Sequence, residues 1–134
     1  MLASDSLTFV SLRGWRIIAD PAALDSAPWP SDAHVVRISP DDAFVIGATE
    51  PTVPADPHAI VTPEHGFAGA ALSAERTEHL ALHHIEWQLP GGARPRVAQG
   101  QIAGVPAKLV LHADGSALLL VACAARHELE ERIA

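Results

Sequence analysis

Cysteine is almost absent from this chain of 134 residues, in which Cys123 is the single one. One cysteine cannot form an internal disulfide, and it excludes a metal site built from several thiolates. Long apolar stretches are missing as well. None reaches the roughly 18 residues that span a bilayer, and the longest, 117–125, runs directly into Arg126. The first residues carry no basic cluster and include Asp5, unlike a secretory signal. These absences predict a cytoplasmic protein without a membrane span.

Positive charge is also scarce in the sequence. Lys and Arg together number 9 against 16 Asp and Glu, which gives a formal net charge of −7. Nucleic acids and anionic membranes favour basic surfaces, because neutralised phosphates release their counterions. We therefore expect neither as a partner. Aromatic residues are limited to three Trp and three Phe, and we expect them to supply bulk to the core or to an interface.

Apolar residues make up 49% of the chain, enough for one hydrophobic core at this length. We expect a single domain over 1–134. Its expected parts are an arm with a short strand and helical turn at 1–32, a hairpin at 33–48, a proline-rich connection at 49–64 and a second half at 65–134. Four prolines make that connection rigid and leave room for only a brief strand at 59–62.

Two stretches of the chain look like copies of one hairpin. Residues 35–48 read VVRISPDDAFVIGA, and residues 108–122 read KLVLHADGSALLLVA. Each is an apolar run, a short turn that contains Asp, and a second apolar run. Pro40 suits a type I turn, and Gly115 after Asp114 suits a turn that needs positive φ. The repeat predicts two antiparallel hairpins in two similar halves.

Capping residues indicate where the helices begin. Asp20 followed by Pro21 is typical of a first helical turn, and Ser73 is a good N-cap. The expected strands and helices describe an α+β fold. Besides the hairpins, strands are expected at 15–19, 66–72, 97–103 and 106–112. The last two form either a strand pair or one long strand bent at Gly104. Helices are expected at 74–88 and 124–133.

Histidines on the main expected helix are candidate metal ligands. His79 and His83 are four residues apart, so that both can face one metal ion. A third ligand would come from Glu75 or Glu86. The alternative is a solvated helix face on which these imidazoles bind nothing.

The sequence offers few candidates for a catalytic nucleophile or a catalytic carboxylate. Cys123 has His127 four positions later, but it ends an apolar strand where cysteine acts as a small hydrophobic side chain. Asp41, Asp42 and Asp114 lie at expected hairpin tips, where carboxylates bind the backbone of the turn. We therefore expect no catalytic residue.

Residues 65–90, HGFAGAALSAERTEHLALHHIEWQLP, and 97–133, VAQGQIAGVPAKLVLHADGSALLLVACAARHELEERI, carry a familiar pattern. Together with the first hairpin they resemble the gamma subunit of heterotetrameric sarcosine oxidase. They are similar, more distantly, to the folate-binding domain of glycine-cleavage aminomethyltransferases. The resemblance covers about residues 33–133. It implies a ferredoxin-like α+β fold with two pseudo-duplicated halves.

The resemblance also implies a role without catalysis. The gamma subunit is an accessory chain that packs against a catalytic subunit with a folate domain. The aminomethyltransferases have an acidic residue before the strand that corresponds to 109–111, where this chain has Ala107 and Lys108. Their Asn–Asp pair corresponds here to Glu86 and Trp87. We expect a protein partner, either an oxidase or aminomethyltransferase-like subunit or a second copy of the chain, and no catalytic activity of its own.

Two alternatives remain at this point. The chain could bind folate or another small anionic ligand, with Arg37, Arg96 and Trp87 as contacts. It could also be a metal-binding protein through His79 and His83. Apart from folate or that metal, no cofactor is expected.

Overall fold

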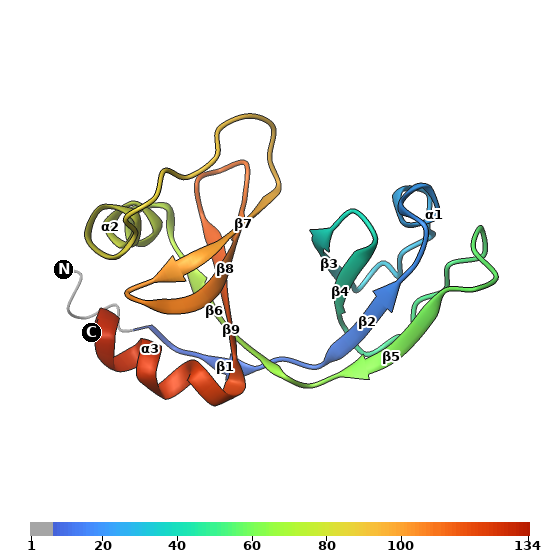
Figure 1. The fold of residues 1–134 in the computed structure, drawn as a ribbon, viewed down its shortest axis with the longest axis horizontal. Coiled ribbons are helices and arrows are strands. Elements are labelled where there is room, and N and C mark those ends of the chain that lie inside the picture. The colour runs from blue at the N-terminus through green and yellow to red at the C-terminus, as the bar shows by residue number, and fades with distance from the viewer. Residues whose placement is uncertain (1–6) are drawn as a thin grey trace. The chain divides into compact units, whose positions relative to one another are not determined.

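The computed structural model describes residues 7–134 and divides the chain into two compact units (Figure 1). The smaller unit is Leu12–His65. The larger unit combines the segment that ends at Ser11 with Gly66–Ala134. The chain therefore leaves the larger unit after Ser11 and returns to it at Gly66. The second half is expected to begin at 65, and the larger unit resumes at Gly66.

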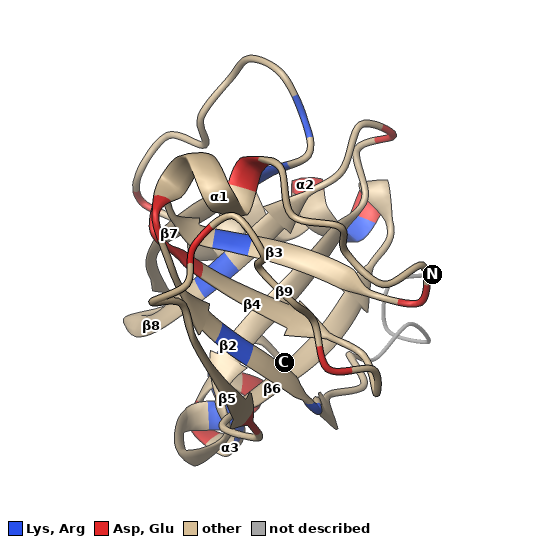
Figure 2. Ribbon diagram, turned by 90° about the vertical axis from the view of Figure 1, so that its right-hand side faces the viewer, with Lys and Arg blue, Asp and Glu red and all other residues tan. Residues whose placement is uncertain are grey.

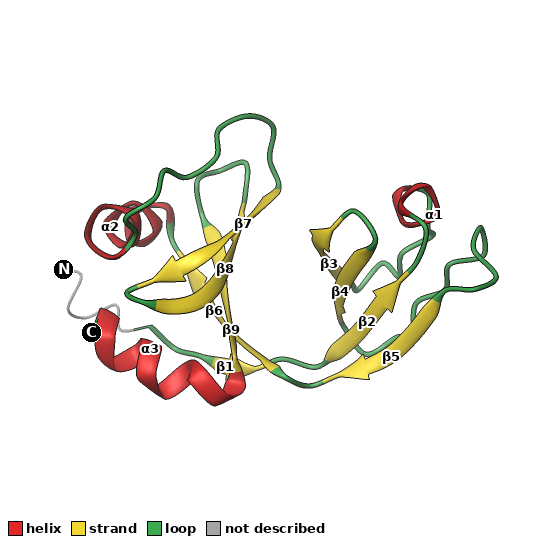
Figure 3. Ribbon diagram, viewed as in Figure 1, coloured by secondary structure: helices red, strands yellow, loops and turns green. Residues whose placement is uncertain are grey.

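The smaller unit is one antiparallel sheet with a single short helix (Figure 3). The strand order is β3-β4-β2-β5. Its elements are β2 (Gly14–Ile18), α1 (Pro21–Asp25), β3 (His34–Ser39), β4 (Asp42–Ile46) and β5 (Ile60–Glu64). The expected proline-rich connection ends in β5, which pairs along its whole length with β2. This stretch is therefore part of the smaller sheet, because its last residues extend far enough to hydrogen-bond with β2.

The helical turn forms where the caps predict it. The Asp20 carboxylate accepts a hydrogen bond from the Ala22 amide at 2.9 Å, and Pro21 occupies the first turn. Leu24 of this turn is fully buried against Ile17 and Val45 of the sheet. One face of the smaller sheet and α1 thus enclose a hydrophobic cluster.

The larger unit has five strands in the order β1-β6-β9-β8-β7, and every neighbouring pair is antiparallel. Its helices supply Leu80 and Leu129 to the main hydrophobic cluster, which also contains Ala68, Leu109 and Leu119 from the sheet. Its elements are β1 (Val10–Ser11), β6 (Phe67–Leu72), α2 (Ala74–His84), β7 (Arg96–Ile102), β8 (Val105–Leu111), β9 (Ala117–Ala122), the 3₁₀ turn η2 (Cys123–Ala125) and α3 (Arg126–Ile133).

Both expected hairpins are present, as β3–β4 and as β8–β9. Gly115 has a φ of +90°, in agreement with the expected turn. The Asp114 carboxylate accepts hydrogen bonds from the amide and the hydroxyl of Ser116. These bonds to Ser116 lower the pKa of Asp114. Of the two arrangements left open around Gly104, the structure has the strand pair, with Ala103 and Gly104 both at positive φ in the turn.

The main helix is shorter than expected. Ser73 caps it as predicted, because its hydroxyl accepts a hydrogen bond from the Arg76 amide at 3.1 Å. The helix ends at His84, and Ile85 is already extended. Trp87 then donates a hydrogen bond from Nε1 to the Gln101 carbonyl at 2.9 Å. Helical periodicity cannot predict this end, because a contact with β7 sets it.

The α+β class is confirmed, with mostly antiparallel sheets and few helices. Acidic positions occur on α1, on α3 and on several loops (Figure 2). Within the described residues, no helix has the length and hydropathy needed to cross a membrane.

Candidate functional site

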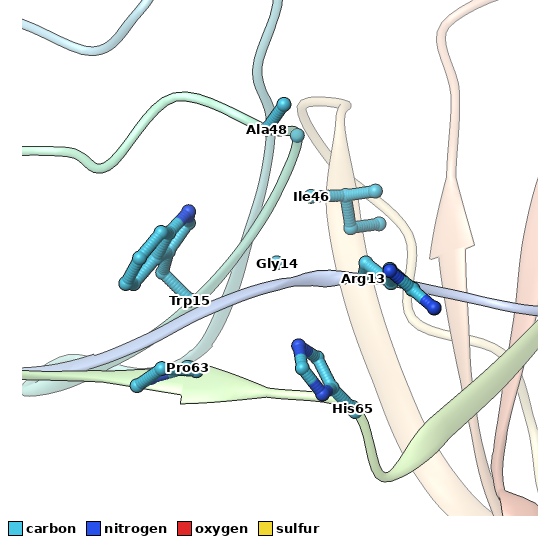
Figure 4. Close-up of a pocket in the computed structure, with 8 residues that line it drawn as sticks. Arg13, Gly14, Trp15, Ile46, Ala48, Pro63 and His65 are labelled. Carbon is cyan, nitrogen blue, oxygen red and sulfur yellow. The ribbon is translucent and has the colours of Figure 1, made fainter.

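A cavity of about 540 Å³ lies in the smaller unit, where β2 begins and β4 and β5 end (Figure 4). Its size falls within the range of small-molecule sites. Figure 4 shows side chains from three separate segments arranged around Gly14. The lining residues are Arg13, Gly14, Trp15, Ile46, Gly47, Ala48, Pro63 and His65.

Gly14 determines how closely the strands approach here. A Cβ atom on this residue would lie 2.1 Å from the Val45 carbonyl oxygen, which no real side chain tolerates. The Gly47 amide also donates a hydrogen bond to the Arg13 carbonyl at 3.2 Å, which holds the end of β4 against the start of β2. Glycine at position 14 therefore allows the backbone arrangement that surrounds the cavity.

The ionisable side chains that line the cavity are basic. They are Arg13 and His65, and no Asp or Glu is among the described lining residues. This is notable in a chain with a net charge of −7. Trp15 is half-buried and adds an aromatic surface to the cavity. A cavity lined by a guanidinium and an indole suits a small ligand that has an aromatic part and a carboxylate or phosphate.

Arg16, which follows Trp15 in β2, forms ion pairs with two acidic residues of the neighbouring strands. Its guanidinium donates to both Asp42 carboxylate oxygens, at 2.6 Å and 2.7 Å, and to Glu64 at 3.1 Å. These partners, Asp42 first, raise the pKa of Arg16. The three residues come from neighbouring strands β4, β2 and β5 and are partly buried. This triad links the smaller sheet across its middle, so we assign it a structural role.

The three residues that the sequence suggested for an anionic ligand do not line this cavity. Arg37 is in the smaller unit, where its guanidinium binds the Pro40 carbonyl and Asp25 at 2.8 Å each. Arg96 and Trp87 are in the larger unit, and the Arg96 guanidinium binds the Gly91 carbonyl. Arg37 thus binds a nearby carbonyl and a carboxylate, and Arg96 binds a nearby carbonyl. These hydrogen bonds hold loops in place.

The histidines of α2 do come together. The ring centroids of His79 and His83 are 4.4 Å apart, and the His84 ring is 6.4 Å from each of them. Burial lowers the pKa of His84, and the neighbouring charges of His79 and His83 lower it further. A second cavity, of about 380 Å³, lies beside this cluster and is lined in part by His83, His84, Glu86 and Trp87. No set of three or more His, Cys, Asp or Glu residues within 7–134 is placed to hold a metal ion.

Two expectations about reactive residues need correction. Cys123 is exposed, because β9 ends at Ala122 and the chain turns there into η2, away from the buried strand positions. His127, four residues after Cys123, has its Nε2 3.1 Å from a Glu131 carboxylate oxygen. The Asp42 carboxylate binds Arg16, because Asp42 is the first residue of β4 and lies beside β2.

Sequence reasoning did not select Arg13, Trp15 and His65 as a site. Arg13 and Trp15 are two residues apart, but His65 and the other lining segment around Ile46 are far from them in the chain, so no local spacing connects the whole set. The one local signal was Gly14 at the start of an expected strand, since glycine in a strand often marks a close approach of two backbones. No protein-family model matches the chain, and no curated protein sequence matches it significantly.

Proposed function

We propose that this protein is a cytoplasmic accessory subunit, without catalytic activity of its own, that binds another protein chain in the manner of the sarcosine oxidase gamma subunit it resembles. The observation that supports this is an exposed apolar pair on the smaller sheet. Ile18 and Ile60 lie directly opposite each other on β2 and β5 and are 40% and 58% exposed. Arg16 and Thr62 follow on the same face. An apolar centre with a polar border is the usual composition of a protein interface.

The position of Ile60 strengthens this proposal. It begins β5, which is an edge strand, and no other described strand pairs with the outer side of β5. An open edge with exposed apolar side chains favours pairing with another chain. Leu82, which is 76% exposed on α2 of the larger unit, offers a control position away from the smaller sheet.

We further infer the finer fold that the resemblance implies, with two pseudo-duplicated, ferredoxin-like halves. The sheet orders support the duplication. In the smaller unit, the first strand β2 lies between β4 of the hairpin and β5. In the larger unit, β6, the first strand after the chain returns at Gly66, lies between β9 of the hairpin and β1. A helix follows both β2 and β6. The larger unit has β7 as an additional strand.

Substitution of Ile60 tests the accessory role. The chain is co-expressed with the oxidase or aminomethyltransferase-like subunit of its host, and light scattering after size exclusion gives the mass. We expect either a joint complex or a multiple of 14.1 kDa, and we expect Ile60→Glu to dissociate it. A charge on the apolar pair would be buried in the complex without a partner. Leu82→Glu should leave the complex intact. A mass of 14.1 kDa under all conditions would contradict the proposal.

A second candidate function is supported by the cavity of the smaller unit. With Arg13 and His65 as its ionisable lining residues and Trp15 in its wall, it suits a planar anionic small molecule. Folate is the ligand that the family resemblance implies. In this alternative the chain binds such a ligand without aminomethyltransferase activity.

Thermal unfolding in the presence of folates tests this alternative. A ligand at 100 times its Kd stabilises the folded state by about 2.7 kcal/mol. We expect folate to raise Tm of the unmodified protein and to lose most of this effect in Arg13→Gln, which lacks the guanidinium at the cavity. Arg126→Gln, on α3 of the larger unit, is the control. If no folate shifts Tm, or if both variants respond as the unmodified protein does, the cavity is not a folate site.

A further inference from the structure

We propose that His79 and His83 on α2 bind one divalent transition-metal ion, such as Zn²⁺, through their imidazole nitrogens. This inference is independent of the proposed accessory role. It concerns the larger unit, whereas the Ile18–Ile60 pair and the basic cavity belong to the smaller one.

The geometry of the two rings carries the proposal. Residues four apart on a helix lie on the same face, about 5–6 Å apart at Cβ. Two imidazoles on one tetrahedral metal have ring centroids about 5 Å apart, given a metal–nitrogen distance of about 2.0–2.1 Å. The centroids of His79 and His83 are 4.4 Å apart, so small side-chain rotations bring both nitrogens to one ion. The rings are inclined by 46°, and a shared ion would lie between them.

The surroundings leave the ion accessible. His83 is exposed and His79 is half-buried, so the pair can be reached from solvent. Two imidazoles fill two coordination positions, and the others remain for water or for an added ligand. The cavity of about 380 Å³ that His83 helps to line gives that ligand space. His84 and Glu86 line the same cavity and could contact such a ligand.

The ligand chemistry selects the metal. Imidazole suits Zn²⁺, Cu²⁺ and Ni²⁺, whereas Mg²⁺ and Ca²⁺ prefer oxygen ligands. The affinity should follow the usual order for nitrogen sites, with Cu²⁺ above Ni²⁺ and Zn²⁺. An ion that bridges positions 79 and 83 also links consecutive turns of α2. It should therefore stabilise the end of this helix, where few side chains are buried.

Calorimetric titration with ZnCl₂ of the full chain, without an affinity tag, tests the proposal. We expect one ion per chain, and we expect His79→Ala and His83→Ala each to weaken the affinity about tenfold or more, since each leaves one imidazole ligand. His58→Ala removes an exposed imidazole in the smaller unit and should have no effect. Circular dichroism establishes that each variant is folded.

A spectroscopic measurement separates direct binding from a structural effect of the substitutions. Electron paramagnetic resonance of Cu²⁺ added to the protein should report nitrogen ligands, and His79→Ala should reduce their number. Loss of Zn²⁺ binding in His127→Ala instead would place the site on α3 and overturn the proposal. Unchanged binding in His79→Ala and His83→Ala, or no binding at millimolar ZnCl₂, would overturn it as well.

Discussion

Gly14→Ala should destabilise the protein by about 3 kcal/mol, at the upper end of the range for forced overpacking. The new methyl group would lie 2.1 Å from the Val45 carbonyl oxygen, and this neighbour is backbone in the middle of a sheet. The strands β2 and β4 cannot move apart to make room for the methyl group without breaking the hydrogen bonds that pair them. Urea unfolding followed by circular dichroism measures the free energy of unfolding.

Gly91→Ala is the matched control for this substitution. A Cβ atom at position 91 would meet no atom within 4 Å, and this glycine does not have positive φ. An exposed substitution of this kind changes the free energy of unfolding by less than about 0.5 kcal/mol. If both variants unfold at the same urea concentration, the close approach at Gly14 has no energetic significance, and the backbone account of the cavity is wrong.

Arg16→Met should lower the free energy of unfolding by about 2 kcal/mol, because hydrogen bonds to charged groups contribute roughly 1.5–3 kcal/mol each and partial exposure reduces this. The side chain of Arg16 is 30% exposed, and those of Asp42 and Glu64 are 16% and 24% exposed. Its removal leaves two carboxylates without this guanidinium on adjacent strands of the smaller sheet. Chemical unfolding at low and high salt measures the loss, which should persist in salt because partly buried pairs are weakly screened.

Arg126→Met provides the comparison for this prediction. Arg126 pairs with Glu130 one helical turn away, at a longer distance of 3.6 Å, and both side chains are more exposed. Such surface pairs contribute at most about 0.5 kcal/mol. Equal effects of the two substitutions would show that the Arg16 triad does not link the sheet in the way its geometry indicates.

Local signals in the sequence predicted much of the fold. The two hairpins follow from apolar runs on either side of Pro40 and of Gly115, and both form with antiparallel pairing. The helix starts follow from Asp20 and Ser73, whose side chains accept backbone hydrogen bonds as capping residues do. In each case the residues that determine the structure are within a few positions of the element that they define.

Features that depend on distant residues were missed. The end of α2 depends on Trp87, whose ring lies on Gly100 of β7, so that a Cβ atom there would be 2.6 Å from the indole. The cavity depends on strand pairing that brings His65 beside Arg13 and Trp15. The expected contacts Arg37 and Arg96 satisfied a chemical criterion, but nearby carbonyl groups bind them in the folded chain. Charge alone does not distinguish a ligand-binding arginine from one that holds a loop.

The path of the chain between its two units has a consequence for the order of folding during synthesis. The smaller unit is one continuous segment, Leu12–His65, and all its strands are available once that segment leaves the ribosome. The larger unit cannot form then, because β1 pairs with β6, which is synthesised after the entire smaller unit. The two residues of β1, Val10 and Ser11, therefore have no strand partner while the smaller sheet forms. Co-translational folding should begin with the smaller unit, and the larger sheet should close only when β9 is complete.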